Sequence, residues 1–139
     1  MKTSYFNLSR YDPGAVSIAR RAPWDFRGPS YPPLFPPEDL LRDYHDGLVA
    51  WEEYEDRYYC GVLGPLDVRK VFDEVCALVA PHEGILTCWE DPLKPNFHCH
   101  RRIAAGRLED KMGIIIPEIA LERAGGEVMG PHTRSLFKT

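Results

Sequence analysis

The chain has 139 residues, of which 44% are hydrophobic and 27% are charged, the usage of a single globular domain. Its net charge of −4 argues against bulk binding of nucleic acid, which requires a basic face, and no apolar run is long enough to span a membrane. The first residues lack a secretory signal and the four cysteines show no Cys-x-x-Cys spacing, so we expect a cytoplasmic protein with reduced thiols.

The N-terminal part predicts two short strands and a long loop. Residues 2–8 are rich in β-forming side chains, and residues 14–19 form a second strand that ends at Arg20 and Arg21. Six of the 13 prolines and four aromatic side chains follow within residues 22–37. Proline restricts the backbone, and aromatic side chains favour packing. We therefore expect a stiff loop that forms a wall or lid near the site.

Three stretches of helical periodicity follow this loop. Their apolar side chains recur at the spacing of amphipathic helices that bury one face in the core. The predicted helices cover residues 37–47, 50–60 and 65–79. Cys60 and Cys76 fall within the second and third of them, and we interpret both as structural.

The second half of the chain predicts a buried strand, a helix and a last strand. Residues 84–89 form a short apolar run that suits a central strand buried on both sides. A loop at 90–97 leads to a helix that begins near His98, and residues 113–119 predict a strand at the sheet edge. The polar tail, residues 125–139, is expected to be loosely ordered.

Alternating strands and helices are typical of an α/β protein. We predict one three-layer, Rossmann-like domain over residues 1–139, with a small, mainly parallel sheet and helices on both faces. In such sheets, ligands bind beyond the carboxyl ends of the strands. Arg20 and the segment Cys88-Trp89-Glu90 should both reach that edge.

The densest group of reactive side chains links the predicted central strand to the next helix. A helix N-terminus attracts anions and lowers the pKa of a cysteine thiol, and arginine can hold a carboxylate or phosphate through two hydrogen bonds. We therefore assign Cys88, Glu90 and Cys99 as catalytic candidates, with Glu90 as acid/base and either thiol as nucleophile. The ligand-binding candidates are Arg20, His100 and Arg101.

Each of these assignments has a structural alternative. Cys88 also suits a small core position, and Arg101 a surface ion pair. His98 and His100 could hold zinc together with the two thiols. Zinc sites, however, normally supply ligands as two short pairs, and consecutive side chains at a helix start point in different directions. We therefore expect no metal, and the sequence assigns no cofactor.

The run Ile85-Leu86-Thr87-Cys88-Trp89-Glu90, followed by Cys99-His100-Arg101-Arg102-Ile103-Ala104, resembles the signature of the domain-of-unknown-function 488 family (DUF488). In that family an apolar strand ends in Cys-aromatic-Glu, and Cys-His-Arg opens the next helix. Segments similar to other parts of the family extend the resemblance over about residues 3–119: Ser17–Pro23, Tyr31–Pro37 and Trp51–Tyr54. The chain departs from the family in a longer loop before Cys99 and in Ala19, where relatives have more polar strand ends.

The resemblance implies an α/β fold and a shared site, and it links that site to nucleotide or nucleic-acid modification. Our first hypothesis is a protein that binds an anionic ligand, such as a nucleotide or a nucleic-acid base with its phosphate, at the helix start near Cys99. The alternative is a non-catalytic binding or adaptor module that uses the proline- and aromatic-rich loop as its contact surface. Substrate, reaction and the existence of a homo-oligomer stay open.

Overall fold

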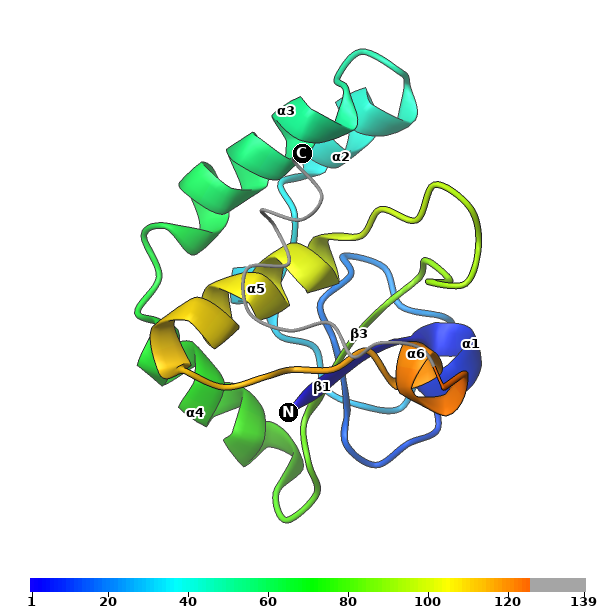
Figure 1. Ribbon diagram of the computed structural model, residues 1–139, viewed down its shortest axis with the longest axis vertical. Coiled ribbons are helices and arrows are strands. Elements are labelled where there is room, and N and C mark those ends of the chain that lie inside the picture. Colours follow the sequence, from blue (N-terminus) through cyan, green and yellow to red (C-terminus); the bar gives the residue numbers. More distant parts are fainter. Residues whose placement is uncertain (126–139) are drawn as a thin grey trace.

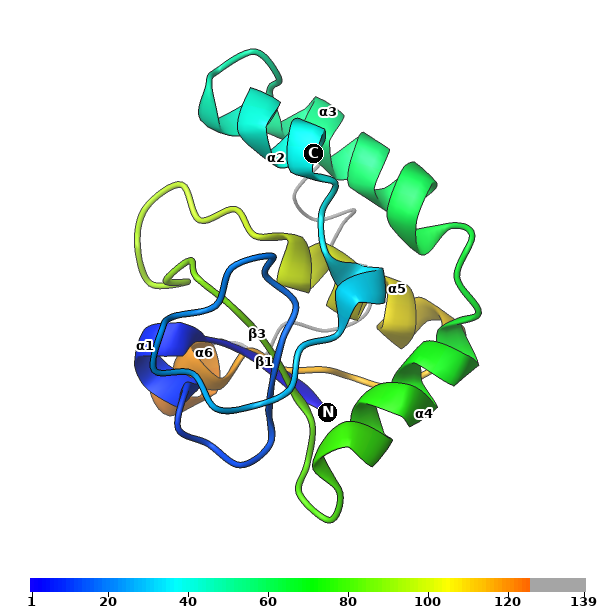
Figure 2. The same ribbon diagram turned by 180° about the vertical axis from the view of Figure 1, so that it is seen from behind.

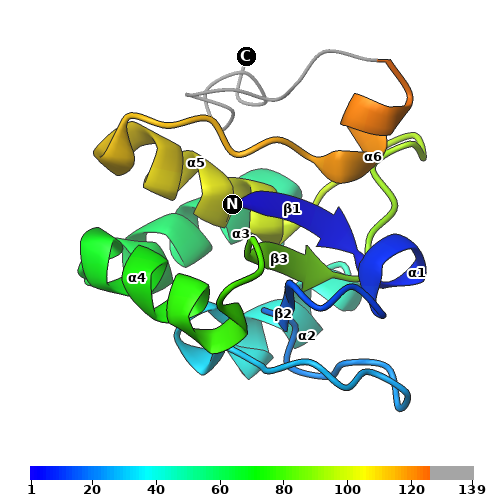
Figure 3. The same ribbon diagram turned by 90° about the horizontal axis from the view of Figure 1, so that it is seen from below.

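A computed structural model of the chain describes residues 1–125. At its centre lies a parallel sheet in the order β1-β3-β2, formed by Lys2–Tyr5, Ile85–Cys88 and Ala15–Ser17. Ile85 is in register with Lys2 on one side and with Ala15 on the other. Figure 3 shows β1 and β3 side by side and pointing the same way. With helices packed against this all-parallel sheet, the predicted α/β class is confirmed.

The helices occupy most of the chain between and after the strands. In chain order they are α1 (Phe6–Ser9), the 3-10 helix η1 (Pro32–Leu34), α2 (Glu38–His45), α3 (Trp51–Tyr58), the π-helical turn η2 (Tyr59–Leu63), α4 (Val68–Val79), α5 (His100–Met112) and α6 (Ile119–Arg123). Figures 1 and 2 show α2 and α3 side by side, and α5 packs next to α3. None of the helices within residues 1–125 has the length and apolar character needed to cross a membrane.

Local sequence signals set several helix ends. The first turn of α2 carries Glu38 and Asp39, whose negative charges suit the positive end of the helix dipole. Asp67 caps α4 by accepting a hydrogen bond from the Lys70 backbone N–H at 3.2 Å. α5 ends at Gly113, which has a left-handed φ of 67° that a glycine adopts without a steric penalty. These boundaries explain why the predicted helices lie close to the observed ones.

The core gathers side chains from the sheet and from the helices around it. Its buried members include Phe6, Val16, Ile18, Leu34, Tyr58, Val75, Leu86, Ala104 and Ile116. The proline-rich loop contributes unevenly, because Tyr31 is buried whereas Trp24 is 90% exposed. The two cysteines interpreted as structural differ as well, since Cys76 is half-buried and Cys60 is exposed.

Two predicted strands differ from the structure. The first ends at Tyr5, because the chain turns into α1 so that Phe6 packs between the rings of Phe26 and Trp89. The predicted strand at 113–119 is wrong. It makes one isolated bridge, and the Ile116 backbone N–H donates to the Glu109 carboxylate at 2.8 Å instead of to a strand. Tertiary contacts here outweigh local β-propensity. Residues 126–139 of the predicted tail lie outside the described residues.

Gly14 provides a test of how closely the chain packs before β2. Its carbonyl accepts the Ile85 N–H at 2.8 Å, and an added Cβ would collide with the Glu83 carbonyl oxygen. We expect Gly14→Ala to lower the free energy of unfolding by about 1–3 kcal/mol, as overpacking does, measured by urea denaturation. Gly61→Ala is the matched control, because no atom lies within 4 Å of its added Cβ. Equal stability of the two variants would contradict the close approach.

Candidate functional site

The carboxyl ends of β2 and β3 open onto a cavity of about 550 Å³. Most of its lining comes from four parts of the chain: residues 19–21 after β2, the α2–α3 pair, residues 88–90 and residues 98–100. Pro36 is the residue of the proline-rich loop that joins this lining. The cavity therefore lies at the edge where ligands bind in parallel α/β sheets.

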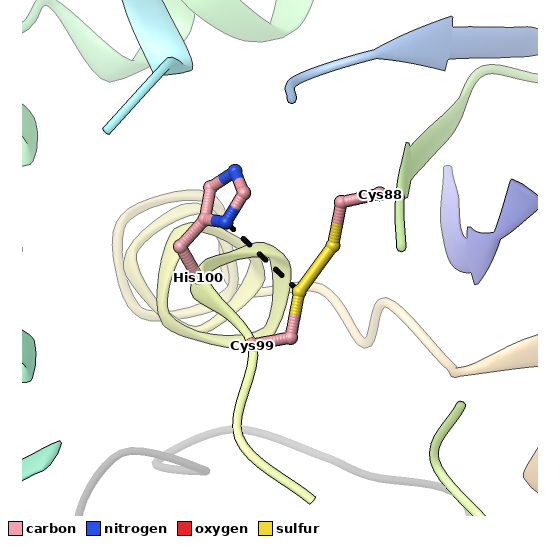
Figure 4. Close-up of side chains that lie close together, drawn as sticks. All are labelled: Cys88, Cys99 and His100. Atoms are coloured by element: carbon pink, nitrogen blue, oxygen red, sulfur yellow. Dashed lines mark hydrogen bonds between the residues drawn. A yellow bond between two sulfur atoms is a disulfide. The ribbon is translucent and has the colours of Figure 1, made fainter. Parts of the chain in front are cut away.

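Two cysteines meet at the floor of the cavity. Cys88 is the last residue of β3, Cys99 is the N-cap of α5, and both are buried. Their sulfurs form a disulfide, and His100 Nδ1 lies 4.0 Å from Cys99 Sγ (Figure 4). This pairing differs from the expectation of reduced thiols. The intervening loop folds back and brings the start of α5 to the end of β3, which residue spacing alone does not reveal.

Arg101 lies fully buried behind this floor. Its Nε and Nη2 donate to the two carboxylate oxygens of Glu118 at 2.9 and 3.0 Å. Nη2 also donates to the Glu90 carbonyl at 2.8 Å, and Nη1 donates to Cys88 Sγ at 3.1 Å. Four hydrogen bonds thus engage the guanidinium, and Arg101 stands outside the cavity lining formed by residues 1–125. Arg101 therefore does not face a ligand in the cavity, in contrast to the predicted anion contact. It holds Cys88 and Glu90 in position instead.

His100 is buried against the end of β2. Its Nε2 lies 2.7 Å from the Ile18 carbonyl oxygen. A carbonyl can only accept, so Nε2 carries the hydrogen and Nδ1 keeps a free lone pair on the side of Cys99. Burial lowers the pKa of His100 to about 4; the bond to Ile18 opposes this shift and the charge of Arg101 adds to it. The imidazole is therefore neutral at neutral pH.

Glu90 faces the cavity beside the cysteine pair. Its Oε2 lies 3.4 Å from Cys88 Sγ. The side chain of Glu90 is exposed to the cavity, but the protein atoms around its carboxyl partly desolvate it and raise the pKa of Glu90 above its ordinary value, against the opposing charges of Arg101 and His45. A carboxyl that keeps its proton to a higher pH than usual is suited to acid/base chemistry.

Arg20 enters the cavity from the end of β2. Its Nε donates to the Pro36 carbonyl at 2.6 Å, and its guanidinium lies 5.9 Å from the centre of the Phe35 ring. The two terminal amino groups make no hydrogen bond to any of residues 1–125. Of the two predicted arginine contacts, Arg20 is the one with donors left for a ligand.

An aromatic wall, consisting of Tyr44, Trp51, Tyr54 and His98, lines the same cavity. The ring of Trp51 stacks on His98 at 4.6 Å and on Tyr54 at 5.0 Å between ring centres. Tyr44 lies 5.1 Å from Tyr54. Burial lowers the pKa of His98, which favours the neutral ring in this wall. His98 thus joins the aromatic side chains rather than the two sulfurs.

Sequence reasoning missed two parts of this site. Three side chains of the aromatic wall, Tyr44, Trp51 and Tyr54, come from helices whose apolar stripes were assigned to the core, since periodicity cannot tell a stripe that faces a cavity from one that faces the interior. Glu118, the partner of Arg101, lies within the segment 113–119 that was predicted as a strand. Its one signal is a carboxylate within an apolar run, which rarely stays buried without a cation.

The buried ion pair between Arg101 and Glu118 can be tested by breaking it. Arg101→Leu leaves the Glu118 carboxylate buried without its cation, so we expect unfolding to require about 3–5 kcal/mol less in a urea titration. Replacing both residues by leucine should recover part of that loss, because both buried charges are then removed. Arg69→Leu is the control, since the pair of Arg69 with Asp73 is exposed. Equal losses for Arg101→Leu and Arg69→Leu would contradict this role.

Comparison of the chain with protein-family models, with curated proteins and with solved structures gave no match.

Proposed function

We propose that this protein binds a small anionic ligand with a planar aromatic ring, of the nucleotide class, in the cavity at the carboxyl edge of the sheet. One observation carries the proposal: the cavity of about 550 Å³ combines an aromatic wall with an arginine whose terminal donors are unused. The volume lies in the range of small-molecule and cofactor sites.

The aromatic wall supplies the recognition of a ring. Trp51 stacks on Tyr54 and on His98, and all three present aromatic surface at the cavity lining. Stacking of a nucleobase on an aromatic side chain contributes about 1–3 kcal/mol. A nucleobase bound against the aromatic wall would therefore lose its contact with water and gain a stacking contact with a flat aromatic surface.

Arginine side chains supply the recognition of the anion. Arg20 is held in place by Pro36, so its terminal amino groups are presented without further loss of side-chain freedom. Arg42 also lines the cavity, and its nearest carboxylate, that of Asp43, lies 3.7 Å away. Both arginines can form the paired hydrogen bonds that phosphate accepts. The lining also contains the carboxyl groups of Glu38, Asp46 and Glu90, so the proposed anion contact depends on the donors of Arg20 and Arg42 and not on the net charge of the lining.

The resemblance to the DUF488 family supports the same site, because its Cys-aromatic-Glu and Cys-His-Arg motifs correspond to the end of β3 and the start of α5. Glu90 is the acid/base candidate of this site, since its carboxyl has a raised pKa and faces the ligand space. Such a group suits a modification reaction on the ring or phosphate of the bound nucleotide. The proposal itself requires binding alone.

The anion contact can be tested with nucleoside monophosphates, their nucleosides and inorganic phosphate in isothermal titration calorimetry. Arg20→Gln removes the charged donors, and we expect at least about tenfold weaker binding of the monophosphates, the usual loss for a hydrogen bond to a charged group. Binding of the parent nucleosides should change far less. Arg69→Gln serves as the control because Arg69 is exposed on α4, outside the cavity lining.

The ring contact is tested in the same titrations by Trp51→Leu, which keeps apolar bulk but removes the stacking surface. We expect monophosphates and nucleosides to lose affinity together, by about 5–150-fold, as stacking energies of about 1–3 kcal/mol imply. Failure of the wild-type protein to bind any of these compounds would overturn the proposal. Unchanged affinity in both Arg20→Gln and Trp51→Leu would show that the ligand binds outside this cavity.

The adaptor alternative has one observation in its favour. Trp24 in the proline-rich loop is 90% exposed, and Tyr11, which donates to Asp25 at 2.6 Å, is 73% exposed beside it. Exposed aromatic side chains concentrate binding energy at protein interfaces. Trp24→Ser separates the two functions, because it should leave nucleotide affinity unchanged if the cavity is the site. A loss of nucleotide binding in this variant would argue against the cavity.

A further inference from the structure

We infer that the reduced forms of Cys88 and Cys99, together with Nδ1 of His100, form a binding site for one divalent metal ion of the zinc type. The three ligand atoms lie within 4.8 Å of one another, and all three residues are buried at the cavity floor (Figure 4). Two thiolates and one imidazole are a ligand set found at catalytic zinc sites. This inference does not depend on nucleotide binding and concerns the floor of the cavity alone.

The backbone brings these ligands together from one strand end and one helix start. Cys99 has the extended conformation of an N-cap (φ −151°, ψ 137°), whereas His100 is the first residue of α5. The change in backbone conformation between them lets consecutive side chains approach one point, which a regular helix would not allow. The Cα atoms of Cys88 and Cys99 lie 7.7 Å apart. Two thiolates on one metal ion are separated by about 3.8 Å, since each metal–sulfur bond measures about 2.3 Å, and this backbone spacing accommodates that spread.

The histidine is prepared as a ligand. The Ile18 carbonyl holds the hydrogen of His100 on Nε2, so Nδ1 presents its lone pair toward Cys99. Metal-binding histidines commonly donate their other N–H to a backbone carbonyl in this way, which fixes both tautomer and ring orientation. The arrangement requires no rotation of the imidazole before metal binding.

The charges around the site balance when the metal is bound. The guanidinium of Arg101 is neutralised by Glu118 and donates to Cys88 Sγ, as outer partners of coordinated thiolates do. Two thiolates then match the two positive charges of the ion. Without the metal, two adjacent thiolates would repel each other in a buried place. The two thiolate charges therefore neutralise a divalent cation bound at this buried position.

The fourth coordination position faces the cavity. Glu90 Oε2 lies 3.4 Å from Cys88 Sγ, and the sulfurs and His100 contribute to the same lining. Three protein ligands with an open position are typical of catalytic rather than structural zinc sites. Water, Glu90 or a group of the cavity ligand would complete the tetrahedron.

Metal binding requires the disulfide to be opened first. A phosphine reductant supplies two electrons and becomes the phosphine oxide, while one water molecule provides its oxygen and the two protons of the new thiols. The metal ion then displaces both thiol protons as it binds. This sequence defines the starting material for the experiment, which is the full chain after phosphine reduction and removal of the reagent under nitrogen.

We propose a titration of this reduced protein with Co²⁺, followed by visible and near-ultraviolet absorption, in the absence of nucleotide. The expected result is one equivalent of Co²⁺ with thiolate-to-cobalt charge-transfer bands and the intense ligand-field bands of a tetrahedral site, displaced by Zn²⁺. His100→Gln keeps an N–H donor for Ile18 but removes Nδ1, and should weaken binding by about 10–100-fold. Cys88→Ser and Cys99→Ser should abolish the charge-transfer bands.

The remaining cysteines give matched controls. Cys60→Ser and Cys76→Ser should bind one equivalent with the wild-type spectrum, because Cys60 and Cys76 are free thiols outside the cavity lining. A second measurement needs no variant: bound Zn²⁺ should slow alkylation of Cys88 and Cys99, read by peptide mass spectrometry, and leave Cys60 unprotected. Circular dichroism confirms that each variant is folded.

Two outcomes would overturn the inference. One is that the reduced, folded protein takes up no stoichiometric Co²⁺, or that the two thiols re-form their disulfide with the metal present. The other is binding that persists when Cys88 and Cys99 are both replaced. Neither outcome bears on nucleotide affinity, so failure here is distinguishable from failure of the proposed function.

Discussion

The architecture of the site depends on one buried ion pair, that of Arg101 with Glu118. Both side chains have no exposed surface, and two hydrogen bonds of 2.9 and 3.0 Å join them. Burying two charges is unfavourable unless the remaining donors and acceptors are also satisfied. Here the guanidinium also reaches the Glu90 carbonyl and Cys88 Sγ, while Thr3 donates to Glu118 at 2.7 Å. The pair therefore ties the start of α5 to Thr3 within β1, to the end of β3 and to the segment before α6.

This constraint explains the position of the reactive groups. Because Arg101 is the second residue of α5, its attachment to the sheet forces Cys99 and His100 against the carboxyl ends of the strands. His100 is then fixed a second time by the Ile18 carbonyl at the end of β2. Two buried contacts from consecutive residues leave the helix start little freedom, so the thiols and the imidazole are preorganised before any ligand arrives.

The opposite side of the cavity is held together by stacked aromatic side chains and not by buried charges. Three of the four side chains of its aromatic wall come from α2 and α3, which pack against each other, and α3 also packs against α5. A polar, charge-paired floor and an apolar, stacked wall thus face one space of about 550 Å³. A ligand with an aromatic ring at one end and an anionic group at the other can contact the aromatic wall with its ring and polar side chains with its anionic group. One small domain thus offers both stacking and charged contacts.

The sequence by itself determined the parallel α/β class, the buried central strand and a helix start near His98, two residues before the observed start at His100, because these depend on hydrophobic periodicity and on proline and glycine. It also placed Cys88, Glu90, Cys99 and Arg20 at one sheet edge, since strands of a parallel sheet share their carboxyl side. Tertiary structure alone decided that Arg101 faces Glu118, that residues 114–117 form no strand and that Trp51 lines a cavity. The physical reason is that each of these three features depends on contacts with residues far away in the sequence, and a local sequence pattern does not show which distant residues come into contact.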